Sequence, residues 1–220
     1  MSVDLKLSPA PEPFAAMILA HGAGAGQTSA FMVRAARDLA QHGLTVATFD
    51  FPYITAGRRI ADRASVLEDA WRAAIDTFRA TIGSLPRGIA GNSSLPLFIG
   101  GKSMGGRIAS HVASQGGAGP LAGLVFFGYP LHPPGKPDQR RDAHLPAIAE
   151  PMLFIQGGRD TFGTGDEIRA LLPRLQLATL HEIPRGDHSF KVPGGKANQE
   201  PVLERVMDTA AAWARGLIPT

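Results

Sequence analysis

The feature that most constrains this sequence is a glycine-rich turn around one serine. Residues 101–105 read Gly-Lys-Ser-Met-Gly, an apolar run at 95–99 precedes them, and helix-forming sequence follows. A serine at such a sharp turn is forced into a strained backbone conformation, and its neighbours must lack bulk because strand and helix approach closely there. A Gly-x-Ser-x-Gly motif between strand and helix is typical of a nucleophile elbow. The motif therefore predicts that Ser103 presents its hydroxyl at the end of a strand.

Strand-like and helix-like segments alternate along the chain. We predict strands at 14–20, 44–49, 95–99, 121–127, 152–156 and 177–183, helices at 27–41, 63–82, 104–115, 166–173 and 199–215, and a polar loop at 83–94. Apolar residues at helical spacing indicate the helices, and short apolar runs bounded by glycine and proline indicate the strands. Strands too apolar to have a wet face are typical of a parallel sheet covered by helices on both sides. The sequence therefore predicts an α/β fold in a single domain over residues 1–220.

Composition and charge exclude several classes of protein. The 22 basic residues are balanced by 19 acidic ones and no run of Lys and Arg stands out, so we expect neither a nucleic-acid nor a membrane surface. The absence of cysteine excludes disulfides, a thiolate nucleophile and a thiolate metal site. The first residues lack the basic start and uninterrupted apolar core of a signal peptide, and the longest apolar run is too short to cross a bilayer. We therefore expect a cytoplasmic protein.

Three candidate catalytic side chains occur in the order Ser103, Asp160, His188. Each lies in a loop after a predicted strand, and the carboxyl ends of parallel strands meet at one edge of the sheet. A serine hydroxyl is a poor nucleophile until a histidine takes its proton, and a carboxylate holds that histidine in the required tautomer. We therefore predict that these side chains form a Ser-His-Asp triad.

Each of these residues also has a plainer interpretation. Ser103 could be a small residue in a tight turn, and Asp160 could only cap a turn. Asp187 is a second candidate acid, but it adjoins His188 in the chain, where the side chains of neighbours usually diverge. His188 is favoured over the six other histidines because it lies in a loop just beyond the last predicted strand. The triad prediction thus depends on how the fold arranges these loops.

The glycine-rich loop at 21–26 is the expected partner of the serine turn. The backbone N–H groups of Gly22 and Ala23, with that of Met104 after the serine, form the predicted oxyanion hole. His21 is expected to order this loop through its ring nitrogens rather than to act in catalysis. The loop lacks the third glycine of a dinucleotide fingerprint, and Gly-Lys-Ser at 101–103 lacks the earlier glycine of a phosphate-binding loop. We therefore expect no nucleotide, metal or other cofactor.

Polar residues after other strand ends are expected to stand on the rim of the site. Tyr53, Arg58 and His132 each follow the carboxyl end of a predicted strand, and Arg59 adjoins Arg58. The two arginines are most simply interpreted as solvated charges. As an alternative, they would favour a substrate with a carboxylate or phosphate near the bond that is cut.

Six stretches of the chain together resemble the α/β-hydrolase superfamily. They are residues 21–26, 49–53 with 57–59, 100–107, 128–132, 156–160 and 186–190. Within the superfamily, the chain is similar to a dienelactone-hydrolase-like branch shared by bacterial hydrolases of unknown substrate, a testis-expressed hydrolase-like protein and the NSL chromatin-complex subunit. The resemblance implies eight strands, so we expect about six to eight, the first two being short within residues 1–13 or missing. It also places the triad on Ser103, Asp160 and His188.

The resemblance also bears on the lid and on the reaction. Many members insert a helical lid after the sixth strand, but only about 23 residues, 128–150, separate the two strands here. We therefore expect no large lid and an open site, which suits small or flexible acyl substrates. The expected activity is that of a serine hydrolase cleaving an ester, thioester or similar acyl bond of a small molecule through an acyl-enzyme. The alternative is a catalytically silent interaction module with the same fold, and the oligomeric state is left open.

Overall fold

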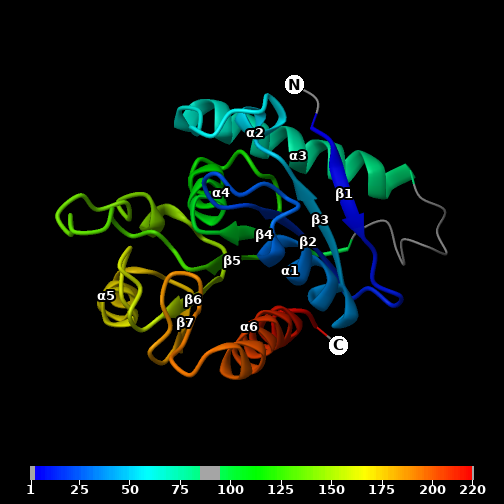
Figure 1. Ribbon diagram of the computed structural model, residues 1–220. Helices are drawn as coiled ribbons and strands as arrows, with labels where there is room; N and C mark the ends of the chain where they lie inside the picture. Colours follow the sequence, from blue (N-terminus) through cyan, green and yellow to red (C-terminus); the bar gives the residue numbers. More distant parts are fainter. Residues whose placement is uncertain (1–2, 85–94, 220) are drawn as a thin grey trace.

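A sheet of seven strands organises the described part of the chain, in the order β1-β3-β2-β4-β5-β6-β7 (Figure 1). The computed structural model describes residues 3–84 and 95–219, so residues 85–94 of the expected polar loop lie outside the described residues. The strands are β1 Leu5–Ser8, β2 Ala15–Ala20, β3 Leu44–Phe49, β4 Leu97–Lys102, β5 Gly123–Phe127, β6 Met152–Gly157 and β7 Ala178–Ile183. All six strands predicted from the residues are present, and β1 adds one within residues 1–13.

Neighbouring strands run parallel everywhere in this sheet except at its β1 edge. β2 pairs with β3 and β4, and the series continues in parallel through β5, β6 and β7. β1 pairs antiparallel with β3, with Leu5 opposite Phe49. The mostly parallel α/β sheet expected from the sequence is therefore confirmed. Parallel pairing places the carboxyl ends of β2 to β7 along one edge, where loops from distant parts of the chain can meet.

Helices cover both faces of the sheet (Figure 1). They are α1 Ala30–Gln41, α2 Pro52–Thr55, α3 Ala64–Ser84, α4 Met104–Ser114, α5 Gly165–Leu171 and α6 Lys196–Gly216, with short 3₁₀ helices η1 Leu145–Ala147 and η2 Leu172–Arg174. Trp71 of α3 and Ile108 of α4 pack with Phe126 on one face. Leu39 of α1 and Val206 of α6 pack with Phe127 on the other. The alternating directions of side chains along each strand divide the core in this way.

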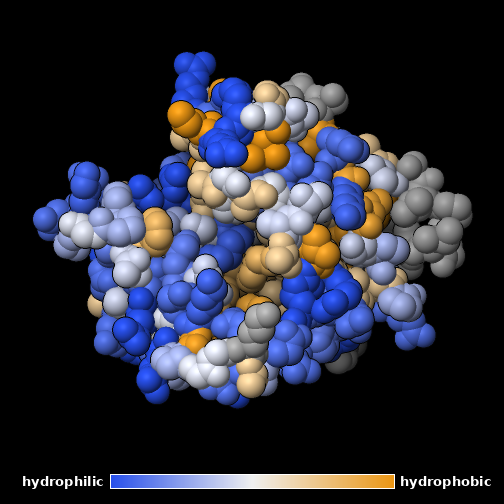
Figure 2. Space-filling model, viewed as in Figure 1, coloured by the Kyte–Doolittle hydropathy of each residue, from blue (hydrophilic) through white to orange (hydrophobic). Residues whose placement is uncertain are grey.

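Both faces of the central strands are buried, whereas the edge strands are partly exposed to solvent. Every residue of β2, β3 and β5 is buried, whereas Thr179 of β7 is exposed and Leu7 of β1 is 37% exposed. An edge strand has a neighbour on one side only, so the prediction of wholly apolar strands fails there. Figure 2 shows that hydrophilic residues cover most of the viewed face and that hydrophobic ones are scattered. No helix in the described ranges is long and apolar enough to cross a membrane.

The serine turn packs against β2 with no room for a side chain between them. Gly105, in the first turn of α4, lies so close to β2 that a Cβ atom added to it would be 2.2 Å from the carbonyl oxygen of Ala20. The indole N–H of Trp71 donates a hydrogen bond to the carbonyl oxygen of Gly105 at 3.2 Å. Backbone therefore faces backbone across this contact, and neither side can yield by rotating a side chain.

We predict that Gly105→Ala lowers the free energy of unfolding by more than about 3 kcal/mol, because the methyl group would overlap a strand backbone rather than a mobile side chain. Urea unfolding followed by circular dichroism measures the change. The matched control is Gly216→Ala at the end of α6, where an added Cβ meets nothing within 4 Å. Equal stability of the two variants would contradict the close approach.

Candidate active site

Ser103 occupies the turn between β4 and α4 in a backbone conformation that non-glycine residues rarely adopt. Its φ is 51° and its ψ is −115°. Its N–H donates to the carbonyl oxygen of Phe127 at 3.1 Å, and its own carbonyl oxygen accepts the N–H of Arg107 at 3.1 Å. Hydrogen bonds to β5 on one side and α4 on the other thus hold a strained residue in place, as the sequence predicts for a nucleophile elbow.

The fold brings Ser103, Asp160 and His188 together from three loops. His188 Nε2 lies 2.8 Å from Ser103 Oγ, and His188 Nδ1 lies 2.7 Å from Asp160 Oδ2. Asp160 follows β6 and is 1% exposed, whereas His188 follows β7 and is partly exposed. A carboxylate can only accept, so Nδ1 carries the proton and Nε2 is left to accept the serine hydroxyl proton. The arrangement can therefore activate the hydroxyl of Ser103.

Asp187, the other candidate acid, has a structural role in its own loop. Its Oδ1 atom accepts the backbone N–H groups of Ser189 at 2.7 Å and Lys191 at 2.9 Å. These bonds shape the loop that carries His188. Of the two acids considered from the sequence, Asp160 is the one that contacts the imidazole.

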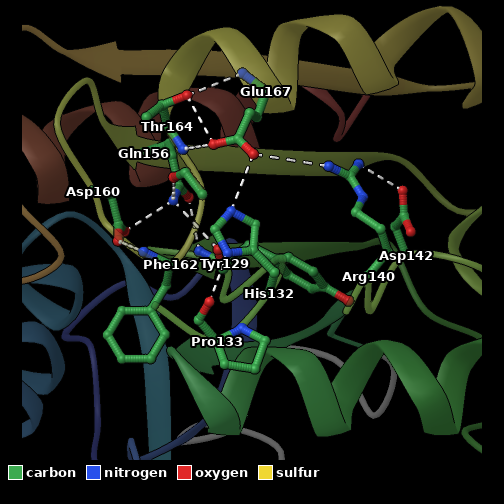
Figure 3. A network of polar contacts seen from close by, with 11 residues as sticks. Tyr129, His132, Pro133, Arg140, Asp142, Gln156, Asp160, Phe162, Thr164 and Glu167 are labelled. Atoms are coloured by element: carbon green, nitrogen blue, oxygen red, sulfur yellow. Dashed lines mark hydrogen bonds and ion pairs between the residues drawn. The ribbon is translucent and has the colours of Figure 1, made fainter. Parts of the chain in front are cut away.

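Gln156 supports Asp160 from inside β6, and the sequence reasoning missed it (Figure 3). Its side-chain amide donates to Asp160 Oδ2 at 2.9 Å and to the carbonyl oxygen of Gly163 at 2.6 Å. Its amide oxygen accepts the N–H of Tyr129 at 2.8 Å, and the N–H of Phe162 donates to Asp160 Oδ1 at 2.8 Å. Both carboxylate oxygens of Asp160 thus have donors besides His188. The signal available in the sequence was one glutamine in the otherwise apolar run at 152–156. The structure shows that it is fully buried, so it needs hydrogen-bond partners.

The loop after β2 reaches the serine turn as expected. A Cβ atom added to Gly22 would lie 3.6 Å from the Cβ of Ser103. Ala23 and Met104 line the same cleft as Ser103, and within the described ranges their backbone N–H groups have no hydrogen-bond acceptor. Unpaired N–H groups beside a nucleophile are what an oxyanion hole requires.

His21 joins this loop to the end of β3. Its Nδ1 atom lies 2.8 Å from the carbonyl oxygen of Gly22, and its Nε2 atom accepts the N–H of Phe51 at 3.2 Å. Burial lowers the pKa of His21. A neutral ring with its proton on Nδ1 satisfies both contacts. His21 therefore orders the glycine loop, in line with the sequence interpretation.

The prediction for the rim of the site is wrong. Tyr53 is fully buried in α2, where its hydroxyl accepts the N–H of Gly24 at 3.0 Å. His132 is also buried, with Nε2 3.0 Å from Glu167 Oε1. Arg58 is exposed, pairs with Asp62 at 2.7 Å, and lies outside the cleft around Ser103. A position after a strand fixes the edge of the sheet, but not the direction in which the side chain points.

The cleft around Ser103 has a volume of about 500 Å³ and a lining that the sequence reasoning only partly identified. Phe162 lines it and packs its ring 4.3 Å from the His188 ring. Three cationic side chains also line it: Lys102, Arg107 and Arg141. No carboxylate is among its lining residues in the described ranges. Nor do the described residues contain a group of three or more potential metal ligands close enough to hold an ion.

Lys102 ties the serine turn to the histidine loop. Its ammonium group donates to the carbonyl oxygen of His188 at 2.6 Å and lies 5.4 Å from the centre of the Phe190 ring. Burial lowers the pKa of Lys102 to about 8. The residue before the candidate nucleophile is therefore a buried cation that braces the loop of the candidate base.

Comparison with known proteins adds the family to this geometry. A family model described as an alpha/beta hydrolase domain matches residues 13–215. The chain belongs to the α/β-hydrolase family. Its seven-stranded sheet is that fold, and the connection between β5 and β6 contains η1 but no helical lid among the described residues.

Solved structures of this fold are similar over almost the whole chain. A lidless α/β serine hydrolase from Xanthomonas campestris is 21% identical with a TM-score of 0.72, covering 99% of this chain and 90% of that one. A dienelactone hydrolase from Anabaena variabilis is 22% identical with a TM-score of 0.73, covering 99% and 93%. Est1E from Butyrivibrio proteoclasticus, solved with ferulic acid, is 15% identical with a TM-score of 0.64, covering 96% and 94%. At these identities the similarity establishes the shared fold.

We predict that Gln156→Met slows the reaction of Ser103 with a fluorophosphonate at least tenfold, because Asp160 loses a hydrogen bond and holds His188 less firmly. The rate of labelling measures the effect, and the melting temperature reports any loss of fold. Gln115→Met is the control, since Gln115 lies at the surface beside Glu68. An unchanged labelling rate in folded Gln156→Met would show that Asp160 needs no such support.

A second prediction concerns Lys102 and the pH dependence of stability. Its pKa of about 8 in the folded chain is below the ordinary 10.5, so the unfolded chain binds more protons between these values. The contribution of Lys102 to the free energy of unfolding therefore rises with pH across this range, by up to about 3 kcal/mol. Urea unfolding at pH 7, 8.5 and 10 should show this rise for the wild type relative to Lys102→Met. Parallel pH profiles would refute it.

Proposed function

We propose that this protein is a serine hydrolase that cleaves an ester, thioester or similar acyl bond of a small molecule. The observation that carries the proposal is the 2.8 Å contact between His188 Nε2 and Ser103 Oγ, with Asp160 2.7 Å behind the imidazole. The strained backbone of Ser103 and the unpaired N–H groups of Ala23 and Met104 support it. No single one of these features would be enough, but acyl transfer uses all of them together.

In the proposed reaction, Ser103 Oγ attacks the carbonyl carbon of the substrate while His188 Nε2 takes the hydroxyl proton. The carbonyl oxygen becomes an oxyanion and accepts hydrogen bonds from the N–H groups of Met104 and Ala23 or Gly22. His188 then gives its proton to the leaving alcohol or thiol as the carbon–oxygen or carbon–sulfur bond breaks. A water molecule gives a proton to His188 and attacks the acyl carbon. The bond from that carbon to Ser103 Oγ then breaks, Oγ takes the proton from His188, and the acid is released. Asp160 stabilises the charged imidazole throughout.

The shape of the cleft supports a small acyl group. The cleft is open to solvent, and its apolar surface comes from Phe162, Pro130 and Met104. An open cleft of about 500 Å³ has room for a short acyl chain, whereas long lipids usually need an enclosed tunnel. We therefore place short-chain esters and thioesters first among the substrates to be tried.

We predict that a fluorophosphonate probe labels the folded wild-type protein and that Ser103→Ala abolishes labelling. Asp160→Asn should lower kcat for a short chromogenic ester by about 10⁴, because the histidine loses the partner that sets its tautomer. The control is His42→Ala, which removes a surface histidine paired with Asp208. Folded wild-type protein that neither labels nor hydrolyses any ester or thioester of a chain-length panel would overturn the proposal.

That negative outcome is the one expected of a catalytically silent interaction module. We propose, more finely, that the chain belongs to the branch similar to the NSL chromatin-complex subunit and the testis-expressed hydrolase-like protein, and this branch gives the silent alternative its rationale. The branch proposal is supported by the shared stretches at 100–107 and 186–190.

We also propose that the protein acts in the cytoplasm, and the cysteine-free sequence fits this proposal.

A further inference from the structure

Two partly buried arginines of the cleft lack ion-pair partners among the described residues. Arg107 and Arg141 both line the cleft with Ser103, and within the described residues neither guanidinium forms an ion pair. The Nε atom of Arg107 is buried and has no hydrogen-bond acceptor in the described part of the chain. A buried donor without an acceptor is uncommon in native proteins and points to a missing partner.

Among the described residues, every arginine outside the cleft either forms an ion pair or, like Arg159 and Arg205, is exposed to solvent. Arg58 contacts Asp62, Arg72 contacts Asp69, and Arg169 contacts Glu182. Water solvates an exposed guanidinium, whereas Arg107 and Arg141 are partly buried and have neither an acid partner nor full solvation among the described residues. Lys102 adds a third positive charge to the cleft, whose described lining contains no carboxylate to balance them.

The unpaired state of Arg107 carries an electrostatic cost. Burial, followed by the nearby charge of Arg141, lowers the pKa of the Arg107 guanidinium. An arginine stays charged nonetheless, so the cost is not relieved by losing a proton. A bound anion relieves it, because a guanidinium offers two parallel N–H groups to two oxygens of one carboxylate or phosphate.

The positions of both arginines relative to Ser103 are fixed by the backbone. Arg107 lies one helical turn beyond Ser103 on α4, about 6 Å along the helix axis, and its N–H bonds to the carbonyl oxygen of Ser103. Arg141 is held in the connection between β5 and β6, where its N–H donates to the carbonyl oxygen of Leu131 at 2.9 Å. The hydroxyl of Tyr129 donates to the carbonyl oxygen of Arg141 at 2.8 Å. Hydrogen bonds thus hold the backbone of both arginines in place beside the cleft.

We propose that Arg107 and Arg141 bind an anionic oxygen group, a carboxylate or phosphate, on the acyl substrate itself, about one helical turn from the carbonyl carbon that Ser103 attacks. This inference deepens the proposed hydrolase function and rests on it, because the bound molecule is taken to be the acyl substrate. The substrate class is that of half-esters or half-thioesters in which a second acidic group remains free. The sequence-based alternative of an anion near the bond that is cut is thereby retained, but Arg58 and Arg59 are replaced as its ligands.

The test compares two esters of equal length that differ in charge. The p-nitrophenyl half-ester of glutaric acid carries the anion, and p-nitrophenyl valerate carries a methyl group there instead. The wild-type protein should have at least a tenfold higher kcat/KM for the half-ester, expressed mainly in KM. Arg107→Met and Arg141→Met should each reduce that preference about tenfold or more, as expected for the loss of a charge-assisted hydrogen bond. Arg107→Lys keeps the charge but loses the two parallel N–H groups of the guanidinium, so its preference for the half-ester should lie between those of the wild type and Arg107→Met.

Arg58→Met is the matched control, since Arg58 is exposed, paired with Asp62 and outside the cleft. It should leave the preference unchanged. If the wild type hydrolyses both esters equally, or if neither cleft variant alters the preference, the anion site is overturned while the hydrolase function stands.

A binding measurement separates failure of the site from failure of the hydrolase function. Ser103→Ala should gain thermal stability with millimolar glutarate or with inorganic phosphate, and this gain should disappear when Arg107→Met is added but persist with Arg58→Met. Stronger stabilisation by glutarate identifies a carboxylate as the natural group, and stronger stabilisation by inorganic phosphate identifies a phosphate. Stabilisation without any turnover would support the anion site and overturn the hydrolase function. No stabilisation by either anion, together with equal rates on the two esters, would overturn the site.

Discussion

The structure depends on one close contact, where the turn after β4 presses against the backbone of β2. Gly105 approaches the carbonyl oxygen of Ala20 so closely that no side chain fits between them. Beside this contact Ser103 has a positive φ, and the start of α4 lies against the loop after β2. Backbone packing thereby helps to place the candidate nucleophile and the N–H of Met104 beside the glycine loop. Side chains add the proton relay, and the His21 ring orders the glycine loop.

The relay is supported by polar groups that are buried in a mostly apolar sheet. Gln156 joins Asp160 to the backbone around Tyr129 and Gly163 (Figure 3). Such a group is costly to bury unless every donor and acceptor finds a partner, and Gln156 meets this condition. Lys102 braces the other side through the carbonyl oxygen of His188. Asp160 therefore holds the imidazole of His188, and Lys102 holds the backbone of the same residue. These two contacts limit the motion of the imidazole without the need for a lid.

Much of the fold could be predicted from the sequence because its signals are local. Apolar runs such as 44–49 and periodic segments such as 63–82 report burial and helical spacing directly, and the corresponding elements β3 and α3 are present. β1 was harder to predict, since an antiparallel edge strand of four residues, Leu5–Ser8, carries little hydrophobic pattern. The adjacency of Asp187 and His188 in the sequence was enough to favour Asp160, because the side chains of neighbouring residues usually diverge.

By itself, the sequence determined the alternating α/β architecture, the strained serine turn and the identity of the three side chains that meet there, since motif and periodicity are properties of neighbouring residues. Only the tertiary structure decided which charges line the cleft. Tyr53 and His132 follow strands as the rim residues were expected to do, yet they are buried, while Arg107 and Arg141 line the cleft with Ser103. The direction of a loop side chain is set by what packs against it from distant parts of the chain, and no local pattern encodes that neighbour.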